Sequence, residues 1–380
     1  MNDYSNQPSY YSPPPQKNNS LVITLLLVAV VAVVSLAVLL YFVGRPVYRR
    51  ASYYRYNTQG NADMKAHNYQ AAINEYSTMI EVRPNKFDGW SFRADAEYRA
   101  GQFTAAIDDD TTAIKLLGTQ AGINEIGFGR DSQAQKLRML PGCLGDLYHN
   151  RALAYDGRGT YGLASRDYST ALTYTPNDWE ARWNRSEDHR RLRDFTGAMA
   201  DANFLVNTYP TRSSVYKQRG DIEQDAGSTS AAIADYSKAI SIKPDVADAY
   251  YALGSIYEKT GQFAKNVACW KQASVECSDN AMVWANLGWA QYLAGDIDGC
   301  IAASRSAIEM DPTMPTALFN TALCYAVKGD WTTAQSYYQK ALTHAGAADR
   351  VGGLGDVQNA LKTHPNSAAL QKAYTLLTSR

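Results

Sequence analysis

A pattern that recurs every 34 residues constrains the fold of this chain more than any other feature. Units aligned on their closing proline begin 34 residues apart, except across one interruption between the second and third units. The eight units start at Tyr53, Phe87, Gly145, Trp179, Ser213, Ala247, Ala281 and Pro315. Each unit reads as two amphipathic helices joined by a tight turn, and a period of this length is typical of arrays of stacked helical hairpins.

Four positions within the unit keep the same kind of residue. A glycine marks the turn, where a chain leaving a helix needs left-handed dihedral angles, at Gly101, Gly159, Gly227, Gly261, Gly295 and Gly329. An aromatic residue follows two positions later, at Tyr69, Phe103, Tyr161, Phe195, Phe263 and Trp331. A small residue that lets two helices approach closely recurs in the second helix, at Ala72, Ala106, Ala164, Ala198, Ala232, Cys300 and Ala334. A proline, which cannot continue a helix, closes five units, at Pro84, Pro176, Pro210, Pro244 and Pro312.

These positions resemble the tetratricopeptide repeat family, whose unit opens with tryptophan, leucine and glycine at fixed spacing. Trp284, Leu287 and Gly288 match that opening, whereas Arg193 replaces the turn glycine of its unit. The resemblance covers residues 53–348. It implies an all-α fold, a right-handed α-solenoid of about eight hairpins whose first helices line a concave groove. Residues 349–380 show helical apolar spacing, so we expect them to form C-terminal capping helices.

An arginine and an aspartate recur together, 16 residues apart, in four units. The pairs are Arg93 with Asp109, Arg151 with Asp167, Arg185 with Asp201, and Arg219 with Asp235. Where the arginine position is apolar, at Leu253 and Leu287, the aspartate position holds Cys269 or Ala303. A half-buried arginine without its carboxylate is costly, so this joint presence favours internal salt bridges over a basic ligand groove.

The family resemblance also implies which first-helix positions face a partner. In the last two units these positions turn apolar, at Met282, Trp289, Tyr292, Phe319, Leu323 and Ala326. Such a wall predicts a protein or peptide ligand in the groove; the alternative is that residues 349–380 fold over the wall and bury it. Some family members clamp the C-terminal carboxylates of chaperones, but Asn57 and Phe92 stand where that clamp needs lysine and asparagine. We therefore expect no chaperone-tail clamp.

The beginning of the chain has a different character. Residues 1–20 form a Pro/Tyr-rich tail that is expected to be disordered. Residues 21–43 carry no charge and, as a helix of about 34 Å, predict a transmembrane span. Residues 44–52 follow as a basic linker, and Arg45, Arg49 and Arg50 favour a cytoplasmic location for the repeats. These features predict a single-pass membrane protein that contacts the lipid bilayer through residues 21–43.

Two further features are less regular. Residues 121–144 interrupt the array, and their glycine-rich start predicts a flexible lead-in followed by one or two helical turns. The insertion is expected to be either a tolerated surface loop or a functional one. The five cysteines are odd in number and show no CxxC spacing, so we expect free buried thiols: Cys143, Cys269, Cys277, Cys300 and Cys324.

The sequence carries no sign of catalysis. It lacks a phosphate-binding loop and an HExxH motif, so we expect neither an enzyme nor a cofactor or metal site. Lys and Arg balance Asp and Glu at 37 each, which gives no indication of a nucleic-acid partner. The sequence predicts a membrane-tethered scaffold that recruits or assembles partner proteins. The alternative is a membrane-anchored holdase or assembly chaperone that faces the non-cytoplasmic side.

Overall fold

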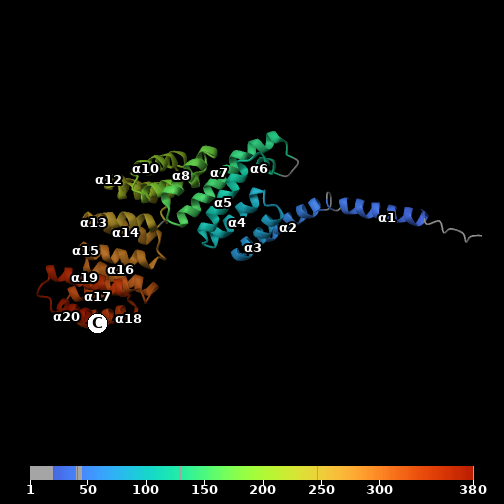
Figure 1. Cartoon of the computed structure of the whole chain (residues 1–380). Helices are drawn as coiled ribbons and strands as arrows, with labels where there is room; N and C mark the ends of the chain where they lie inside the picture. The colour runs from blue at the N-terminus through green and yellow to red at the C-terminus, as the bar shows by residue number, and fades with distance from the viewer. Residues whose placement is uncertain (1–19, 40, 42–44, 128–130, 246, 380) are drawn as a thin grey trace, which may run out of the picture. The chain divides into compact units, whose positions relative to one another are not determined.

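The structure, a computed structural model, describes residues 20–39, 41, 45–127, 131–245 and 247–379. The described residues form twenty α-helices and no strand, which confirms the all-α fold (Figure 1). The chain divides into two compact units, residues 1–159 and residues 160–380. Most of the tail predicted at residues 1–20 lies outside the described residues.

The first unit contains seven helices within its described part. They are α1 (Ser20–Leu39), α2 (Arg45–Lys65), α3 (Tyr69–Val82), α4 (Phe87–Arg99), α5 (Phe103–Leu117), α6 (Gln120–Asn124) and α7 (Gln133–Gly157). Helices α2 with α3 and α4 with α5 pack as hairpins, and α7 packs against α5.

The second unit contains the other thirteen helices of the described residues. They are α8 (Tyr161–Tyr174), α9 (Trp179–Arg191), α10 (Phe195–Thr208), α11 (Ser213–Asp225), α12 (Thr229–Ile242), α13 (Ala247–Lys259), α14 (Phe263–Glu276), α15 (Ala281–Leu293), α16 (Ile297–Met310), α17 (Pro315–Val327), α18 (Trp331–His344), α19 (Ala347–Thr363) and α20 (Ala368–Thr378). From α9 to α18 each helix packs against the next, so neighbouring hairpins bury one another's apolar faces.

The turns between paired helices take the predicted backbone conformation. All six turn glycines have a positive φ, from 69° at Gly261 to 85° at Gly329. Arg193 takes the glycine's place with φ 60°, and His67 does so in the first hairpin with φ 59°. Aspartates begin several second helices: Asp194, for example, accepts a hydrogen bond from the Gly197 amide at 3.0 Å.

Close packing within a hairpin depends on small residues in both helices. The repeated alanines of the second helices are at most 1% exposed. In the first helices a glycine receives an aromatic ring from its partner. A Cβ atom at Gly220 would lie 2.8 Å from the Tyr236 ring, and one at Gly254 would lie 2.6 Å from Trp270. The helices therefore approach at distances that larger side chains would prevent.

Two first helices are longer than the repeat predicts. Helix α2 begins at Arg45, so most of the predicted linker 44–52 is helical. Helix α7 begins at Gln133, inside the insertion 121–144, and continues through Pro141. Ser132 and Gln135 form a reciprocal capping box at its start, which satisfies amides that would otherwise lack partners. The insertion thus contributes α6 and a long helical extension, more than the one or two turns predicted.

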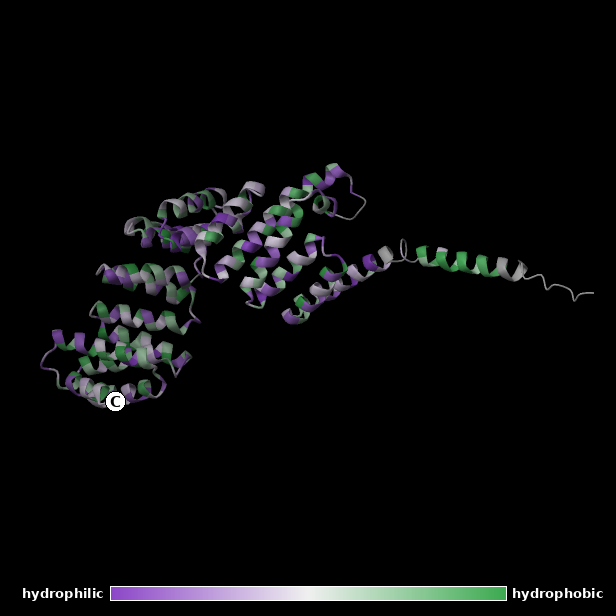
Figure 2. Cartoon of the chain, viewed as in Figure 1, coloured by the Kyte–Doolittle hydropathy of each residue, from purple (hydrophilic) through white to green (hydrophobic). Residues whose placement is uncertain are grey.

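The prediction of a single-pass membrane protein is wrong. Helix α1 ends at Leu39, and residues 40 and 42–44 of the predicted span lie outside the described residues. Figure 2 shows α1 as hydrophobic along most of its length. Even so, no helix in the described ranges combines the length and the apolar character that a membrane crossing requires. The predicted bilayer contact, the orientation and the membrane tether of both functional hypotheses lose their basis with it.

The cysteines also differ in part from expectation. Cys300 and Cys324 form a disulfide that joins α16 to α17, so the prediction of free thiols is wrong for these two. Both cysteines are 0% exposed and belong to the core between the two helices. Cys143, Cys269 and Cys277 are free, as predicted; Cys269 and Cys277 are also buried, whereas Cys143 is only half-buried.

Candidate functional site

The three predicted arginine–aspartate pairs that lie within one compact unit are hydrogen-bonded with a shared geometry. Each guanidinium donates from Nε and Nη2 to the two oxygens of one carboxylate. The Nε to Oδ2 distances are 2.6 Å for Arg93–Asp109, 2.8 Å for Arg185–Asp201 and 2.6 Å for Arg219–Asp235. The carboxylates are at most 9% exposed and the arginines about one-fifth exposed. Such bidentate pairs fix the two helices of a hairpin in register.

The remaining guanidinium nitrogen, Nη1, reaches the preceding hairpin. It donates to Ser77 from Arg93, to Ser169 from Arg185 and to Asn203 from Arg219, at distances of 2.9 to 3.1 Å. Arg151 makes the equivalent bond to Thr111, at 2.9 Å. Arg151 and Asp167 belong to different compact units, so their pairing stays a prediction. The arginines therefore connect successive hairpins.

A glutamate lies four residues after two of these arginines. Glu97 follows Arg93 and Glu223 follows Arg219. Burial and the neighbouring aspartate raise the pKa of each glutamate to about 7, although the arginine opposes the shift. The aspartate takes both strong guanidinium bonds, which leaves the Glu97 carboxylate at 3.7 Å from Arg93 Nε. Each cluster therefore contains one carboxyl group that titrates near neutral pH.

Half of the predicted groove residues are buried by the C-terminal helices. Phe319, Leu323 and Ala326 are at most 6% exposed and share a core with Val357 of α19. Gly353 of α19 lies so close to the Phe319 ring that a Cβ atom there would be 2.8 Å away. The structure thus favours, for these three residues, the alternative in which the segment 349–380 covers the wall.

The other predicted groove residues remain partly accessible on α15. Met282 is 38% exposed, and Trp289 and Tyr292 are half-buried. The Trp289 and Tyr292 rings stack with centroids 5.2 Å apart. Trp289 Nε1 donates to Glu258 of α13 at 3.1 Å. We call Glu258, Trp289, Tyr292 and Asp356 the acidic–aromatic patch.

The patch carries negative charge without a matching cation. Burial and the nearby Glu258 raise the pKa of Asp356 to about 6. Burial and Asp356 raise the pKa of Tyr292. Within the described residues, Asp356 makes no hydrogen bond or ion pair and Glu258 no ion pair. Two carboxylates beside stacked aromatic rings are a suitable environment for a positively charged side chain.

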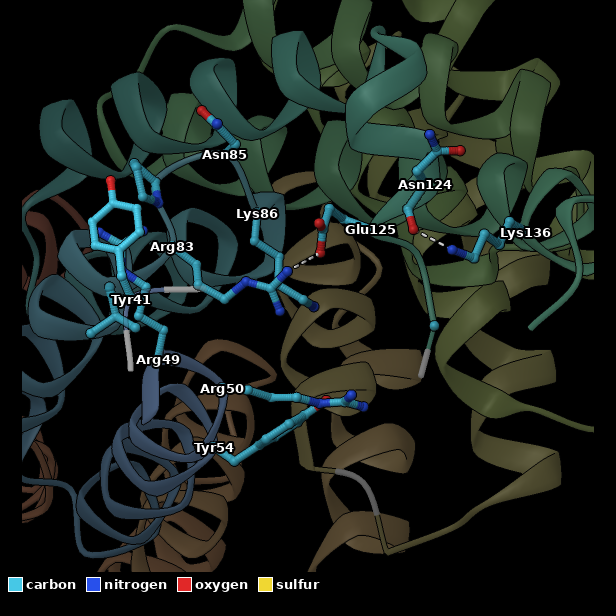
Figure 3. A pocket seen from close by; sticks show the side chains of 13 residues that line it. Tyr41, Arg49, Arg50, Tyr54, Arg83, Asn85, Lys86, Asn124, Glu125 and Lys136 are labelled. Atoms are coloured by element: carbon cyan, nitrogen blue, oxygen red, sulfur yellow. Dashed lines mark hydrogen bonds and ion pairs between the residues drawn. The ribbon is translucent and has the colours of Figure 1, made fainter. Parts of the chain in front are cut away.

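A second concave feature lies in the first unit, between α2, the turn from α3 to α4, and the insertion (Figure 3). The cavity measures ≈ 770 Å³. One carboxylate, Glu125, lines it together with five cationic side chains: Arg49, Arg50, Arg83, Lys86 and Lys136. We call this cavity the basic pocket. The sequence did not single it out, because its residues come from three segments that only the fold brings together.

The cations of the basic pocket differ in how they are held. Arg83 donates to Glu125 at 2.7 Å, and Lys86 pairs with Asp88 just outside the lining. Lys136 is 8% exposed and donates to the Asn124 carbonyl oxygen, as Figure 3 shows.

Ser165, His189 and Asp194 form a hydrogen-bonded chain in the second unit. Ser165 Oγ lies 3.3 Å from His189 Nε2, and His189 Nδ1 lies 2.8 Å from Asp194. Ser165 is 7% exposed within α8, and Asp194 caps α10. These contacts link three helices and leave the hydroxyl closed to a substrate. In the described part of the chain no group of three or more His, Cys, Asp or Glu side chains could hold a metal ion. The expectation of no enzyme, cofactor or metal stays a prediction.

Parts of the chain match models of the tetratricopeptide repeat. A tetratricopeptide repeat model matches residues 57–118 and 285–350, and a TPR repeat model matches residues 220–261. Serine/threonine-protein phosphatase 5 from Rattus norvegicus is 28% identical over 130 residues, which are 34% of this chain. The chain spans only 21% of the length of that relative.

One matching solved structure shows the same architecture. The C-terminal part of a TPR repeat-containing protein from Cytophaga hutchinsonii matches with a TM-score of 0.52 and 14% identity, covering 69% of this chain and 97% of its own. YrrB, described as a TPR protein with an unusual peptide-binding site, matches with a TM-score of 0.38 and 15% identity, covering 55% of this chain and 97% of its own. At 14% identity, the match to the Cytophaga hutchinsonii protein shows the fold alone.

Proposed function

We propose that this chain, which contains tetratricopeptide repeats, is a protein-binding scaffold whose second unit takes a partner segment with a basic side chain. Stacked helical hairpins present extended surfaces to which peptides and proteins bind. The half-buried Asp356 carboxylate, which lacks a cation beside the Trp289–Tyr292 stack, carries the proposal. Nothing in the proposal requires a membrane.

The chemistry of the acidic–aromatic patch supports a lysine or arginine of the partner. Its charge would approach Asp356 and Glu258, and its aliphatic stem would lie on the rings of Trp289 and Tyr292. A cation over an aromatic face contributes about 0.5–2 kcal/mol, depending on how far it is desolvated. The accessible thioether of Met282 adds an adaptable apolar contact at the start of α15.

Selection of peptides on the full-length protein tests this proposal. A random peptide library displayed on phage should enrich sequences with a lysine or arginine flanked by apolar residues. One enriched peptide, labelled for fluorescence anisotropy, should bind Trp289→Ala about ten-fold more weakly than the unmodified protein. Asp356→Asn should weaken binding about five-fold, because it removes the charge and keeps the shape of the side chain.

The control is Val275→Ala, which trims an apolar side chain of α14 that is 75% exposed and is not one of the patch residues. Its affinity should stay within about two-fold of the unmodified protein, as expected of a position without partner contacts. Enriched peptides that bind Trp289→Ala and Asp356→Asn at unchanged affinity would exclude the patch as the binding site.

A further inference from the structure

We propose that the basic pocket of the first unit binds a phosphate group. This inference goes beyond the scaffold function, because it concerns different residues, a different compact unit and the opposite charge. Five cations line the pocket: Arg49 and Arg50 of α2, Arg83 and Lys86 of the α3–α4 turn, and Lys136 of α7. Three segments far apart in sequence thus place five cations around one cavity, with Glu125 as the single carboxylate of the lining.

The charge excess is local rather than a property of the chain. Lys and Arg equal Asp and Glu in number over all 380 residues. Arg83 and Lys86 each have a carboxylate partner, so their charges are largely compensated. Among the described residues, Arg49, Arg50 and Lys136 have no ion pair. Three uncompensated cations therefore converge on the same cavity.

Of the three uncompensated cations, Lys136 gives the strongest indication of a bound anion, because it is buried. Lys136 is 8% exposed, and its ammonium group donates a hydrogen bond to the carbonyl oxygen of Asn124. A buried ammonium normally requires a carboxylate or a bound anion to offset its lost hydration. The cavity beside it can hold that anion, and Figure 3 shows Lys136 and Asn124 on the same side of the pocket as Glu125.

Three uncompensated cations favour a phosphate over a carboxylate as the bound anion. A carboxylate carries one negative charge, whereas a phosphate monoester carries about −1.5 to −2 at pH 7 and offers three acceptor oxygens. Guanidinium groups bind phosphate through paired N–H donors. Next to the cations lie the Tyr54 ring, Val82 and Pro84, which can contact the organic part of an ester. The cavity of ≈ 770 Å³ is large enough for such a group.

Isothermal titration calorimetry of the full-length protein tests the proposal with three probes: phenyl phosphate, inorganic phosphate and benzoate. Phenyl phosphate should bind at least about ten-fold more tightly than benzoate, because it carries the additional charge and oxygens. The comparison of phenyl phosphate with inorganic phosphate separates the two sources of the group. Tighter binding of the ester identifies a phosphorylated molecule, and equal binding identifies free phosphate.

Variants locate the site. Arg49→Gln and Arg50→Gln should each weaken phenyl phosphate binding about five-fold, and Lys136→Gln about ten-fold. Arg55→Gln is the matched control, since Arg55 is an exposed arginine of the same helix that does not line the basic pocket. Both substituted arginines are solvent-accessible on α2, so their variants test the site even if Lys136→Gln fails to fold.

Two results would overturn the proposal. One is benzoate binding as tightly as phenyl phosphate, which would show that the pocket does not select a dianion. The other is an equal loss of affinity in Arg55→Gln and in the Arg49→Gln/Arg50→Gln double variant, which would show a diffuse surface effect. Neither result bears on the peptide selection, because the acidic–aromatic patch shares no residue with the basic pocket.

Discussion

The arginine–aspartate pairs show how a repeat can replace an apolar contact by a charged one while its helices stay the same. Leu253 and Leu287 occupy this position in two units and are at most 6% exposed. Arg219 occupies it in another and binds Asp235 through two hydrogen bonds. Since Asp235 is 6% exposed, the loss of either partner leaves a charge that water can only partly solvate.

A double-mutant cycle on Arg219 and Asp235 tests this interpretation. Asp235→Ala and Arg219→Ala should each lower the free energy of unfolding by about 2 kcal/mol, and the double variant should be no less stable than the worse single variant. Urea denaturation followed by circular dichroism measures all four proteins. Additive losses would contradict an energetic interaction between the two side chains.

Glu97, which is buried, and Glu223, which is half-buried, predict a stability that falls towards alkaline pH. Folding raises the pKa of Glu97 and Glu223 from 4.5 to about 7. A raised folded-state pKa contributes stability that is fully present below about pH 4.5 and is lost as pH rises through about 7. Glu97→Gln and Glu223→Gln mimic the protonated form. Each should therefore exceed the unmodified protein in stability by roughly 1 kcal/mol at pH 8 and match it near pH 5.

Thermal unfolding at several pH values measures this effect. Glu180→Gln serves as the control, because Glu180 is an exposed glutamate of α9. It should change stability equally little at both pH values. If Glu97→Gln and Glu223→Gln gave no gain at pH 8, the two carboxyl groups would have to be ionised at no cost in the folded protein.

At the scale of the helices, the turn between α9 and α10 is strained relative to its neighbours. Arg193 adopts φ 60° where six other turns use glycine. Arg193→Gly should stabilise the protein by about 0.5 kcal/mol, since relief of the left-handed conformation exceeds the entropy cost of glycine. Gly227→Ala should destabilise it by about 1 kcal/mol for the converse reason. Chemical denaturation measures both; a destabilising Arg193→Gly would show that the contact of Arg193 with the Phe195 ring outweighs the strain.

The helices were largely predictable because the repeat marks their boundaries. Six predicted unit starts coincide with the first residues of α4, α9, α11, α13, α15 and α17. The two that do not are Tyr53 and Gly145, where the helix extends towards the N-terminus. Upstream of Tyr53 no helix-stopping residue follows Pro46, and upstream of Gly145 the helix continues through Pro141, which sequence rules take as a boundary. The repeat period gives no information outside the repeat.

The candidate sites were less predictable, since they depend on contacts outside the repeat. Helix α19 covers Phe319, and this contact could not be predicted because α19 belongs to a segment that follows no repeat pattern. The basic pocket forms only because the insertion folds next to the α3–α4 turn, a contact that the repeat pattern does not predict. The disulfide between Cys300 and Cys324 depends on the distance between two helices, which residue spacing alone does not give.

At the scale of the whole molecule, two surfaces of opposite charge lie in separate compact units. The basic pocket belongs to the first unit and the acidic–aromatic patch to the second. Lys and Arg equal Asp and Glu in number over the whole chain, so the net charge of zero indicates neither surface. The proposed peptide site and the proposed phosphate site share no residue, so binding at one would not compete for the surface of the other.

The disulfide between α16 and α17 has a mechanical consequence. A stacked array under tension unravels from its end, hairpin by hairpin, because each helix is held only by its neighbours. A pull on the C-terminus of this chain would release α20, α19 and α18 and then meet the covalent link. The segment from Cys300 to Cys324, a sequence separation of 24, could not lengthen, which withholds about 85 Å of extension until the link is reduced.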